Sequence, residues 1–138
     1  MKAHERVTAA IRAANDAGRT GLVPFVTAGY PEPKDFISTL KAVASVADVV
    51  EVGNPFSDPM ADGMTIQRSS FEALHKGVTL AWIFDELEKA GGFDAPLVMM
   101  SYLNPLLAFG YERLADLSLI HISEPTRQLT QSRMPWSA

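Results

Sequence analysis

Short apolar segments alternate with segments of helical period over most of the chain. The apolar segments cover residues 22–28, 47–52 and 96–103. A strand that is apolar on both faces is typical of a parallel sheet that helices cover. Parallel neighbours need a crossover between successive strands, and this crossover is right-handed in nearly all proteins. The alternation therefore predicts an α/β fold built on a parallel sheet.

The segments between the predicted strands show the 3.6-residue period of amphipathic helices. Gly18, Gly77 and Gly91 mark helix ends, and Thr79 has a side chain that can cap the start of a helix. The predicted helices cover residues 5–17, 35–45, 65–76 and 80–90. In the third helix, Ile66, Ser70 and Leu74 are predicted to align.

Prolines set the expected limits of two strands. Pro24 lies inside the first apolar segment, so the strand there is expected to begin late or to lack a hydrogen bond at that position. The dipeptide Asn104-Pro105 is expected to end the third strand, because the residue before a proline avoids the helical region.

Composition excludes several classes of protein. The chain has 138 residues, which is the length of one domain, with a net charge of -4 and no Lys/Arg cluster that predicts nucleic-acid binding. It has no cysteine, and its three histidines are scattered, so we predict neither a disulfide framework nor a metal site. The N-terminus lacks a signal peptide's apolar block, and no apolar run approaches a membrane span. We expect a cytoplasmic protein.

The stretch 49–67 combines a strand, a long loop with two prolines and two glycines, and the start of a helix. In a β/α protein the loops at the carboxyl ends of strands converge on a shared pocket. Glu51 lies near the end of this strand and Asp62 lies in the loop beyond it. Two carboxylates that approach one pocket are candidates for proton transfer, with one giving a proton and the other accepting one.

Three sequence blocks together resemble the tryptophan synthase alpha chain family. They are Pro-Phe-Val-Thr-Ala-Gly at 24–29, Glu-Val-Gly-Asn-Pro-Phe-Ser-Asp-Pro-Met-Ala-Asp-Gly at 51–63 with Thr-Ile-Gln at 65–67, and Tyr-Leu-Asn-Pro at 102–105. The middle block is specific, and the three blocks occur in the family's order over roughly residues 7–116. The resemblance implies a TIM (β/α)8 barrel, with about the first three β/α units present in residues 1–116.

The resemblance also implies an activity, which is retro-aldol cleavage of indole-3-glycerol phosphate to indole and glyceraldehyde 3-phosphate in tryptophan biosynthesis. The family's catalytic acids align with Glu51 and Asp62. The reaction requires protonation of indole C3 and removal of a proton from the glycerol hydroxyl, and we assign both transfers to Glu51. Asp62 is expected beside the indole N–H, where a carboxylate stabilises the positive charge that develops on the ring.

Family position and closeness to strand ends suggest the remaining site residues. Phe25 is expected to pack on the indole ring, with Met100 or Tyr102 as another wall of the substrate site. Pro55 and Asp58 are expected at the interface with a beta chain, since the family uses this loop for that contact. The family forms an alpha2beta2 assembly in which pyridoxal phosphate belongs to the beta chain, so the alpha chain is expected to need no cofactor and no metal.

Each site residue also has a purely structural interpretation. Glu51 would be a solvated or ion-paired strand end, Asp62 a turn residue before glycine, and Phe25 and Met100 ordinary core. Two other functions are compatible with the chain. One is a non-catalytic module that activates a beta chain through residues 54–62, and the other is a different sugar-phosphate enzyme on the same barrel.

The chain departs from the family pattern at two loop positions. Asn54 replaces a branched apolar residue, and it must find a hydrogen-bond partner or cost about 1 to 3 kcal/mol. Met64 replaces a proline, which is expected to loosen the segment that carries Asp62.

The resemblance ends at about Asp116. Residues 117–127 read Leu-Ser-Leu-Ile-His-Ile-Ser-Glu-Pro-Thr-Arg, which resembles one translated reading frame of a transposase-based sequencing adapter. We therefore expect residues 117–138 to be an artefactual tail, disordered or loosely helical. The remaining part is under half of a barrel of about 250 residues and lacks the phosphate-binding loops after strands 7 and 8. We expect this 138-residue chain to be inactive.

Overall fold

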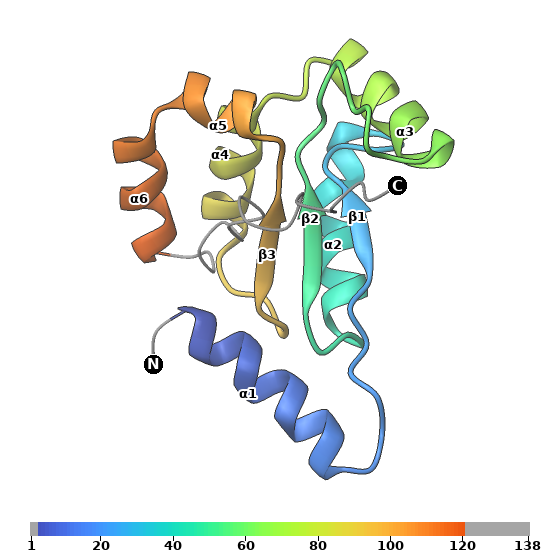
Figure 1. Cartoon of the computed structure of the whole chain (residues 1–138), viewed down its shortest axis with the longest axis vertical. Coiled ribbons are helices and arrows are strands. Elements are labelled where there is room, and N and C mark those ends of the chain that lie inside the picture. The colour runs from blue at the N-terminus through green and yellow to red at the C-terminus, as the bar shows by residue number, and fades with distance from the viewer. Residues whose placement is uncertain (1–2, 121–138) are drawn as a thin grey trace, which may run out of the picture.

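The computed structural model describes residues 3–120, and these residues form a three-stranded sheet with helices around it (Figure 1). The order of helices and strands agrees with the alternation predicted from the sequence. The elements are α1 (Ala3–Asp16), β1 (Phe25–Thr27), the 3-10 helix η1 (Pro33–Asp35), α2 (Phe36–Ala44), β2 (Val50–Gly53), α3 (Met64–His75), α4 (Leu80–Ala90), β3 (Leu97–Met100), α5 (Leu103–Phe109) and α6 (Tyr111–Ile120).

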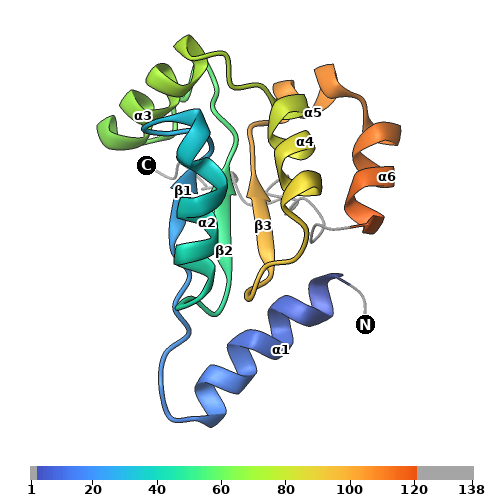
Figure 2. The same ribbon diagram turned by 180° about the vertical axis from the view of Figure 1, so that it is seen from behind.

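The sheet is parallel throughout and has the order β1-β2-β3. Helices α2 and α4 cover one of its faces, as the view from behind shows most clearly (Figure 2). Helices α3 and α5 lie at the carboxyl ends of the strands, and α1 lies across the opposite end (Figures 1 and 2). This arrangement is three consecutive units of a parallel β/α architecture, which agrees with the predicted partial barrel.

The hydrophobic core lies between the sheet and helices α2 and α4. Phe36 and Leu40 project from α2, and Ile83 and Leu87 from α4, with at most 5% of each residue exposed. Burying a side chain of this size stabilises the fold by about 1.5 to 3 kcal/mol. The strands contribute Val50, Val52, Leu97 and Met99 to the same core. Thr79 caps α4 as predicted, with its hydroxyl accepting a hydrogen bond from the Trp82 N–H at 3.2 Å.

β1 begins late, as Pro24 predicted. The strand starts at Phe25, and Leu22 and Val23 before it are exposed. Proline has no N–H to donate, but the Pro24 carbonyl accepts a hydrogen bond from the Glu51 N–H at 2.9 Å. The backbone therefore pairs with β2 before the regular ladder begins.

The residues predicted to align along α3 differ in burial. Ser70 is buried together with Ser69 and Ala73, whereas Ile66 and Leu74 are half-buried. α3 lies across the carboxyl end of β1, where the hydroxyls of Thr27 and Ser69 share a buried hydrogen bond. That polar contact turns the small residues of α3 toward the sheet.

The prediction that Asn104-Pro105 ends the third strand is wrong. β3 already ends at Met100, and Leu103–Phe109 forms the helix α5, which includes Asn104 and Pro105. Pro105 is the third residue of α5, and a proline in the first turn removes an N–H that has no partner within the helix. The apolar segment 96–103 therefore includes β3, a two-residue connection and the first residue of α5, Leu103.

The predicted tail divides between described and undescribed residues. Residues 117–120 complete α6, so the first four residues of the tail are helical. Residues 121–138 lie outside the described residues, and the prediction of a disordered or loosely helical tail falls there. Within the described range, the helices are too short or too polar to cross a membrane.

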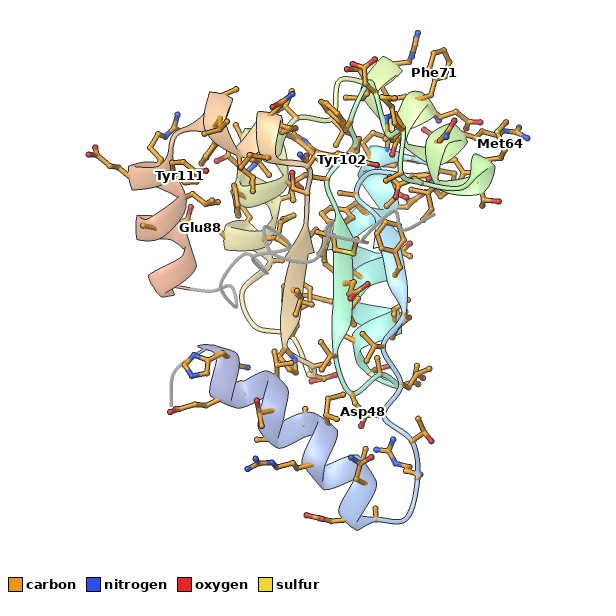
Figure 3. The ribbon with its side chains drawn as sticks, in the orientation of Figure 1. Asp48, Met64, Phe71, Glu88, Tyr102 and Tyr111 are labelled. Carbon is orange, nitrogen blue, oxygen red and sulfur yellow. The ribbon has the colours of Figure 1, made fainter. Side chains whose placement is uncertain are left out.

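An ion pair joins the segment after α1 to the start of β2. The Arg19 guanidinium donates hydrogen bonds of 2.6 and 2.7 Å to the two carboxylate oxygens of Asp48 (Figure 3), and the Leu22 N–H donates to the same carboxylate at 2.7 Å. The hydrogen bond from Arg19 and that from Leu22 lower the pKa of Asp48 to about 2. This contact holds the amino ends of β1 and β2 together.

Candidate active site

The sheet face opposite α2 and α4 carries the side chain of Glu51. Val50 and Val52, its neighbours in β2, are buried in the core, and side chains alternate between the two faces of a strand. The register pairs Glu51 with Phe25 of β1 and with Val98 of β3. Residues paired across parallel strands lie on the same face, so Phe25, Glu51 and Val98 form one row, and all three are half-buried.

Gly53 gives the Phe25 ring its place on this face. A Cβ atom built at Gly53 would overlap the Phe25 ring. The ring therefore leans from β1 over the backbone of β2, two residues beyond Glu51 toward the carboxyl end of the sheet. Any larger residue at this position would displace an aromatic side chain that neighbours the candidate acid.

Met100 lies on the same face as Glu51, one row nearer the carboxyl end. The register pairs it with Gly53, and Gly53 pairs with Thr27. The Met100 carbonyl accepts a hydrogen bond from the Asn54 N–H at 2.8 Å, which extends the ladder by one residue beyond β2. The register thus places Phe25, Glu51 and Met100 on one face of the sheet, and their roles stay predictions.

Asp62 lies in the loop between β2 and α3 and is half-buried. Its backbone is held on both sides, because its N–H donates to the Pro59 carbonyl at 3.0 Å and its carbonyl accepts from Gln67 Nε2 at 2.8 Å. Helix α3 begins two residues later at Met64, with Gly63 as its N-cap residue. The loop therefore has defined hydrogen bonds around Asp62, and the loosening expected from Met64 stays a prediction.

Tyr102 lies above the end of β3, beside the loop that carries Asp62 (Figure 3). Its hydroxyl accepts a hydrogen bond from the Ala61 N–H at 3.0 Å, and its ring stacks on Phe56 with 4.9 Å between centroids. Burial raises the pKa of the Tyr102 phenol, the hydrogen bond from the Ala61 N–H opposes this rise, and the charge of the neighbouring Asp62 carboxylate adds to it. The structure groups Tyr102 with Asp62, and Phe25 and Met100 with Glu51.

Asn54 has the hydrogen-bond partner that its burial requires. Only 8% of the residue is exposed, and its Nδ2 donates to the Ser101 hydroxyl at 3.1 Å. The Ser101 hydroxyl in turn donates to the Tyr102 carbonyl at 3.0 Å. The sequence indicated that Asn54 needs a partner, but Ser101 was not predicted, because it lies 47 positions away.

The two predicted interface residues differ in exposure. Pro55 is buried within the chain, whereas Asp58 is exposed and accepts a hydrogen bond from the Ser57 hydroxyl at 2.8 Å. The apolar side chains of Met60 and Met64 on the same stretch are also exposed, with 91% and 79% of each residue accessible. The roles of Pro55 and Asp58 in contacting a partner stay predictions.

Sequence comparison identifies similar proteins over most of the chain. The family model described as tryptophan synthase alpha chain matches residues 11–122. The tryptophan synthase alpha chain of Nitratidesulfovibrio vulgaris (strain DP4) is 49% identical over 110 residues, covering 78% of this chain and 43% of the relative. That of Laribacter hongkongensis is 49% identical over 117 residues, covering 80% and 43%. The chain therefore spans less than half the length of these relatives.

Solved structures give the same result for the fold. The crystal structure of tryptophan synthase subunit alpha from Legionella pneumophila superposes with a TM-score of 0.74 at 33% identity, covering 82% of this chain and 44% of that one. Tryptophan synthase from M. tuberculosis in an aminoacrylate-bound form superposes with a TM-score of 0.72 at 31% identity, covering 82% and 46%. The three β/α units correspond to part of the barrel in these proteins.

Proposed function

Because the chain belongs to the tryptophan synthase alpha chain family, we propose that it contributes the first part of a lyase site that cleaves indole-3-glycerol phosphate to indole and glyceraldehyde 3-phosphate. The observation that carries this proposal is the row of Phe25 and Glu51 on the open sheet face, with Met100 beside it at the carboxyl ends of the strands. Active sites of such barrels are built at that end. The process served is tryptophan biosynthesis in the cytoplasm.

Glu51 is the proposed acid-base residue. Cleavage begins when a proton is added to indole C3, which turns the ring into an electron sink for the carbon–carbon bond that breaks. Loss of the glycerol hydroxyl proton then produces the aldehyde. Glu51 is half-buried beside the Phe25 ring. The ring would supply an apolar wall for the indole, and the Glu51 carboxylate would reach the substrate's hydroxyl.

Asp62 is the proposed partner of the indole N–H. A carboxylate at that position stabilises the positive charge that grows on the ring after protonation, and in a pocket that excludes water this effect is stronger than in solution. The backbone hydrogen bonds from Gln67 and to Pro59 reduce the movement needed to bring Asp62 to the ring. Phe25, Met100 and Tyr102 are the proposed walls of the indole site. The chemistry uses these side chains without a metal or an organic cofactor.

A beta chain is the proposed partner, in an alpha2beta2 assembly, with pyridoxal phosphate held by the beta chain. The exposed side chains of Asp58 and Met60 support this proposal, since they lie on the loop next to Asp62. Pro55 would contribute by shaping the loop from within. The same exposure favours a second function, in which the loop activates a beta chain without catalysis.

The 138-residue chain is proposed to be inactive by itself. The chain spans about 43% of its relatives' length, and a barrel of this type binds phosphate through loops after strands 7 and 8. The three strands described here do not include those loops. An indole-release assay with the purified chain checks this, and a rate that Glu51→Gln abolishes would contradict it.

A chimeric enzyme tests the proposed catalytic roles. Residues 1–116 would replace the matching segment of the Laribacter hongkongensis relative, and indole release from indole-3-glycerol phosphate would be measured. We expect activity in the chimera and a fall in kcat of about 10²- to 10⁴-fold for Glu51→Gln. Glu88→Gln is the matched control, because Glu88 is exposed on α4 (Figure 3). An active chimera whose rate is unaffected by Glu51→Gln would refute the proposal.

The alternative function, activation of a beta chain without catalysis, predicts a different result in the same chimera. If the loop activates a beta chain without catalysis, a Glu51→Gln chimera would still bind and activate a beta chain, and the parent chimera would release no indole. A chimera that shows both lyase activity and beta-chain binding supports the catalytic proposal.

A further inference from the structure

Tyr102 contacts both limbs of the loop that carries Asp62. Its ring stacks on Phe56 near the start of the loop, and its hydroxyl accepts the hydrogen bond from the Ala61 N–H near the end. Both contacts come from the side chain of Tyr102, which lies two residues after the end of β3 and is the N-cap residue of α5. Forty-one positions separate Ala61 from Tyr102, so the contact joins two distant parts of the chain.

The backbone of Tyr102 is held from the other side. Asn54 Nδ2 donates to the Ser101 hydroxyl at 3.1 Å, and that hydroxyl donates to the Tyr102 carbonyl at 3.0 Å. The Asn54 N–H also donates to the Met100 carbonyl at 2.8 Å. These hydrogen bonds join the carboxyl ends of β2 and β3 and fix the position of the Tyr102 backbone.

We propose that Tyr102 is a positioning residue whose hydroxyl, through the Ala61 N–H, holds Asp62 in place over the carboxyl ends of β2 and β3. The effect on catalysis rests on the proposed function, in which Asp62 faces the indole N–H. The anchoring of the loop by Tyr102 does not depend on that function. Asp62 is adjacent to Ala61, so a shift of the Ala61 amide moves the backbone of Asp62. Gln67 holds the Asp62 carbonyl from the helix side, and Tyr102 supplies the second anchor from the strand side.

Hydrogen–deuterium exchange of the 138-residue chain tests the anchor directly, without any requirement for activity. Tyr102→Phe keeps the ring that stacks on Phe56 and removes the hydroxyl oxygen. We expect exchange of the Ala61 amide to become roughly 3- to 10-fold faster, the effect of one lost hydrogen bond. The Val50 amide, which donates to the Pro96 carbonyl at 3.0 Å, should keep its rate and serves as the internal reference for global unfolding.

Tyr111→Phe is the matched control, because Tyr111 is a tyrosine of α6 whose residue is 55% exposed (Figure 3). It should leave the exchange of Ala61 unchanged. Equal Ala61 exchange in the native chain and in Tyr102→Phe would overturn the anchor. If Tyr102→Phe fails to fold, the native chain decides: a slowly exchanging Ala61 amide supports the proposal, and one that exchanges at the rate of an unstructured peptide overturns it.

The chimeric enzyme separates the two proposals. There Tyr102→Phe should lower kcat by about 3- to 10-fold with a smaller change in KM, because the substrate still binds while the carboxylate is less well placed. Loss of Ala61 protection without any change in kcat or KM would remove the positioning role and leave the lyase proposal intact. An inactive chimera whose Ala61 amide is still protected from exchange would instead refute the proposed function and support the Tyr102 anchor.

Discussion

The hydroxyl oxygens of Thr27 and Ser69 lie 2.7 Å apart in a buried hydrogen bond that joins the carboxyl end of β1 to α3. The Ser69 hydroxyl donates to the Ile66 carbonyl at 3.0 Å, so the Thr27 hydroxyl is the donor within the pair. A polar pair at this position fixes the rotation of α3, whose other buried residues are Ser70 and Ala73. Helix α3 follows the loop of Asp62, so the pair contributes to the placement of the candidate site.

Removing one hydroxyl of this pair should destabilise the fold. Thr27→Val keeps the shape of the side chain and leaves the Ser69 hydroxyl with one fewer partner, so we expect a loss of about 1 to 3 kcal/mol in the free energy of unfolding. Urea denaturation measures it. The double variant Thr27→Val with Ser69→Ala should be less destabilised than the sum of the two single changes. Additive effects would contradict a direct interaction.

Adding a methyl group at Gly53 should disturb the Phe25 ring. Gly53→Ala forces the ring to move, with an expected cost of about 1 to 3 kcal/mol in the free energy of unfolding from overpacking. Gly92→Ala is the control, since a Cβ there meets nothing within 4 Å and Gly92 lies outside the helices and strands. Urea denaturation compares the two variants, and equal stability of Gly53→Ala and the native chain would show that the ring has room to adapt.

The Arg19–Asp48 ion pair should make the free energy of unfolding depend on pH below about pH 4. The pKa of Asp48 is about 2 in the folded chain against an ordinary 3.8, so the folded state binds this proton less readily than the unfolded state. Stability from this group is complete above about pH 4 and is lost as the pH falls toward 2. Asp48→Asn should flatten that part of a plot of unfolding free energy against pH.

An exposed aspartate supplies the control for this prediction. Asp94 lies in the turn between α4 and β3, and Asp94→Asn should keep the native loss of stability between pH 4 and pH 2. If Asp48→Asn and Asp94→Asn give the same pH profile as the native chain, the ion pair does not contribute in the way proposed.

Thr79 should stabilise α4 through its cap. Thr79→Ala leaves the Trp82 N–H without its acceptor in the first turn, and we expect a loss of about 1 kcal/mol in the free energy of unfolding. Thr79→Ser retains a hydroxyl and should restore most of the stability in thermal or urea unfolding. A serine variant as unstable as the alanine variant would assign the effect to the lost methyl group.

The amino-acid sequence alone predicted the local structure, because local structure depends on neighbours in the chain. The period of 80–90 and the Thr79 cap predicted α4 to the residue, and Pro24 predicted the late start of β1. The polar Asn54 indicated a hydrogen-bond partner before any partner was known. The order of strands and helices followed from the same local signals, and the specific loop at 51–63 indicated the family.

The tertiary structure decided which distant residues meet. The pairing of Asn54 with Ser101 and of Ala61 with Tyr102 depends on how β2 and β3 lie side by side, and no spacing in the sequence encodes it. The burial of α3 has the same origin: hydrophobic period indicates that a helix has an inward face, and contact with the buried hydroxyl of Thr27 places Ser69 on it. Local preference determines the elements, and packing between elements determines the site.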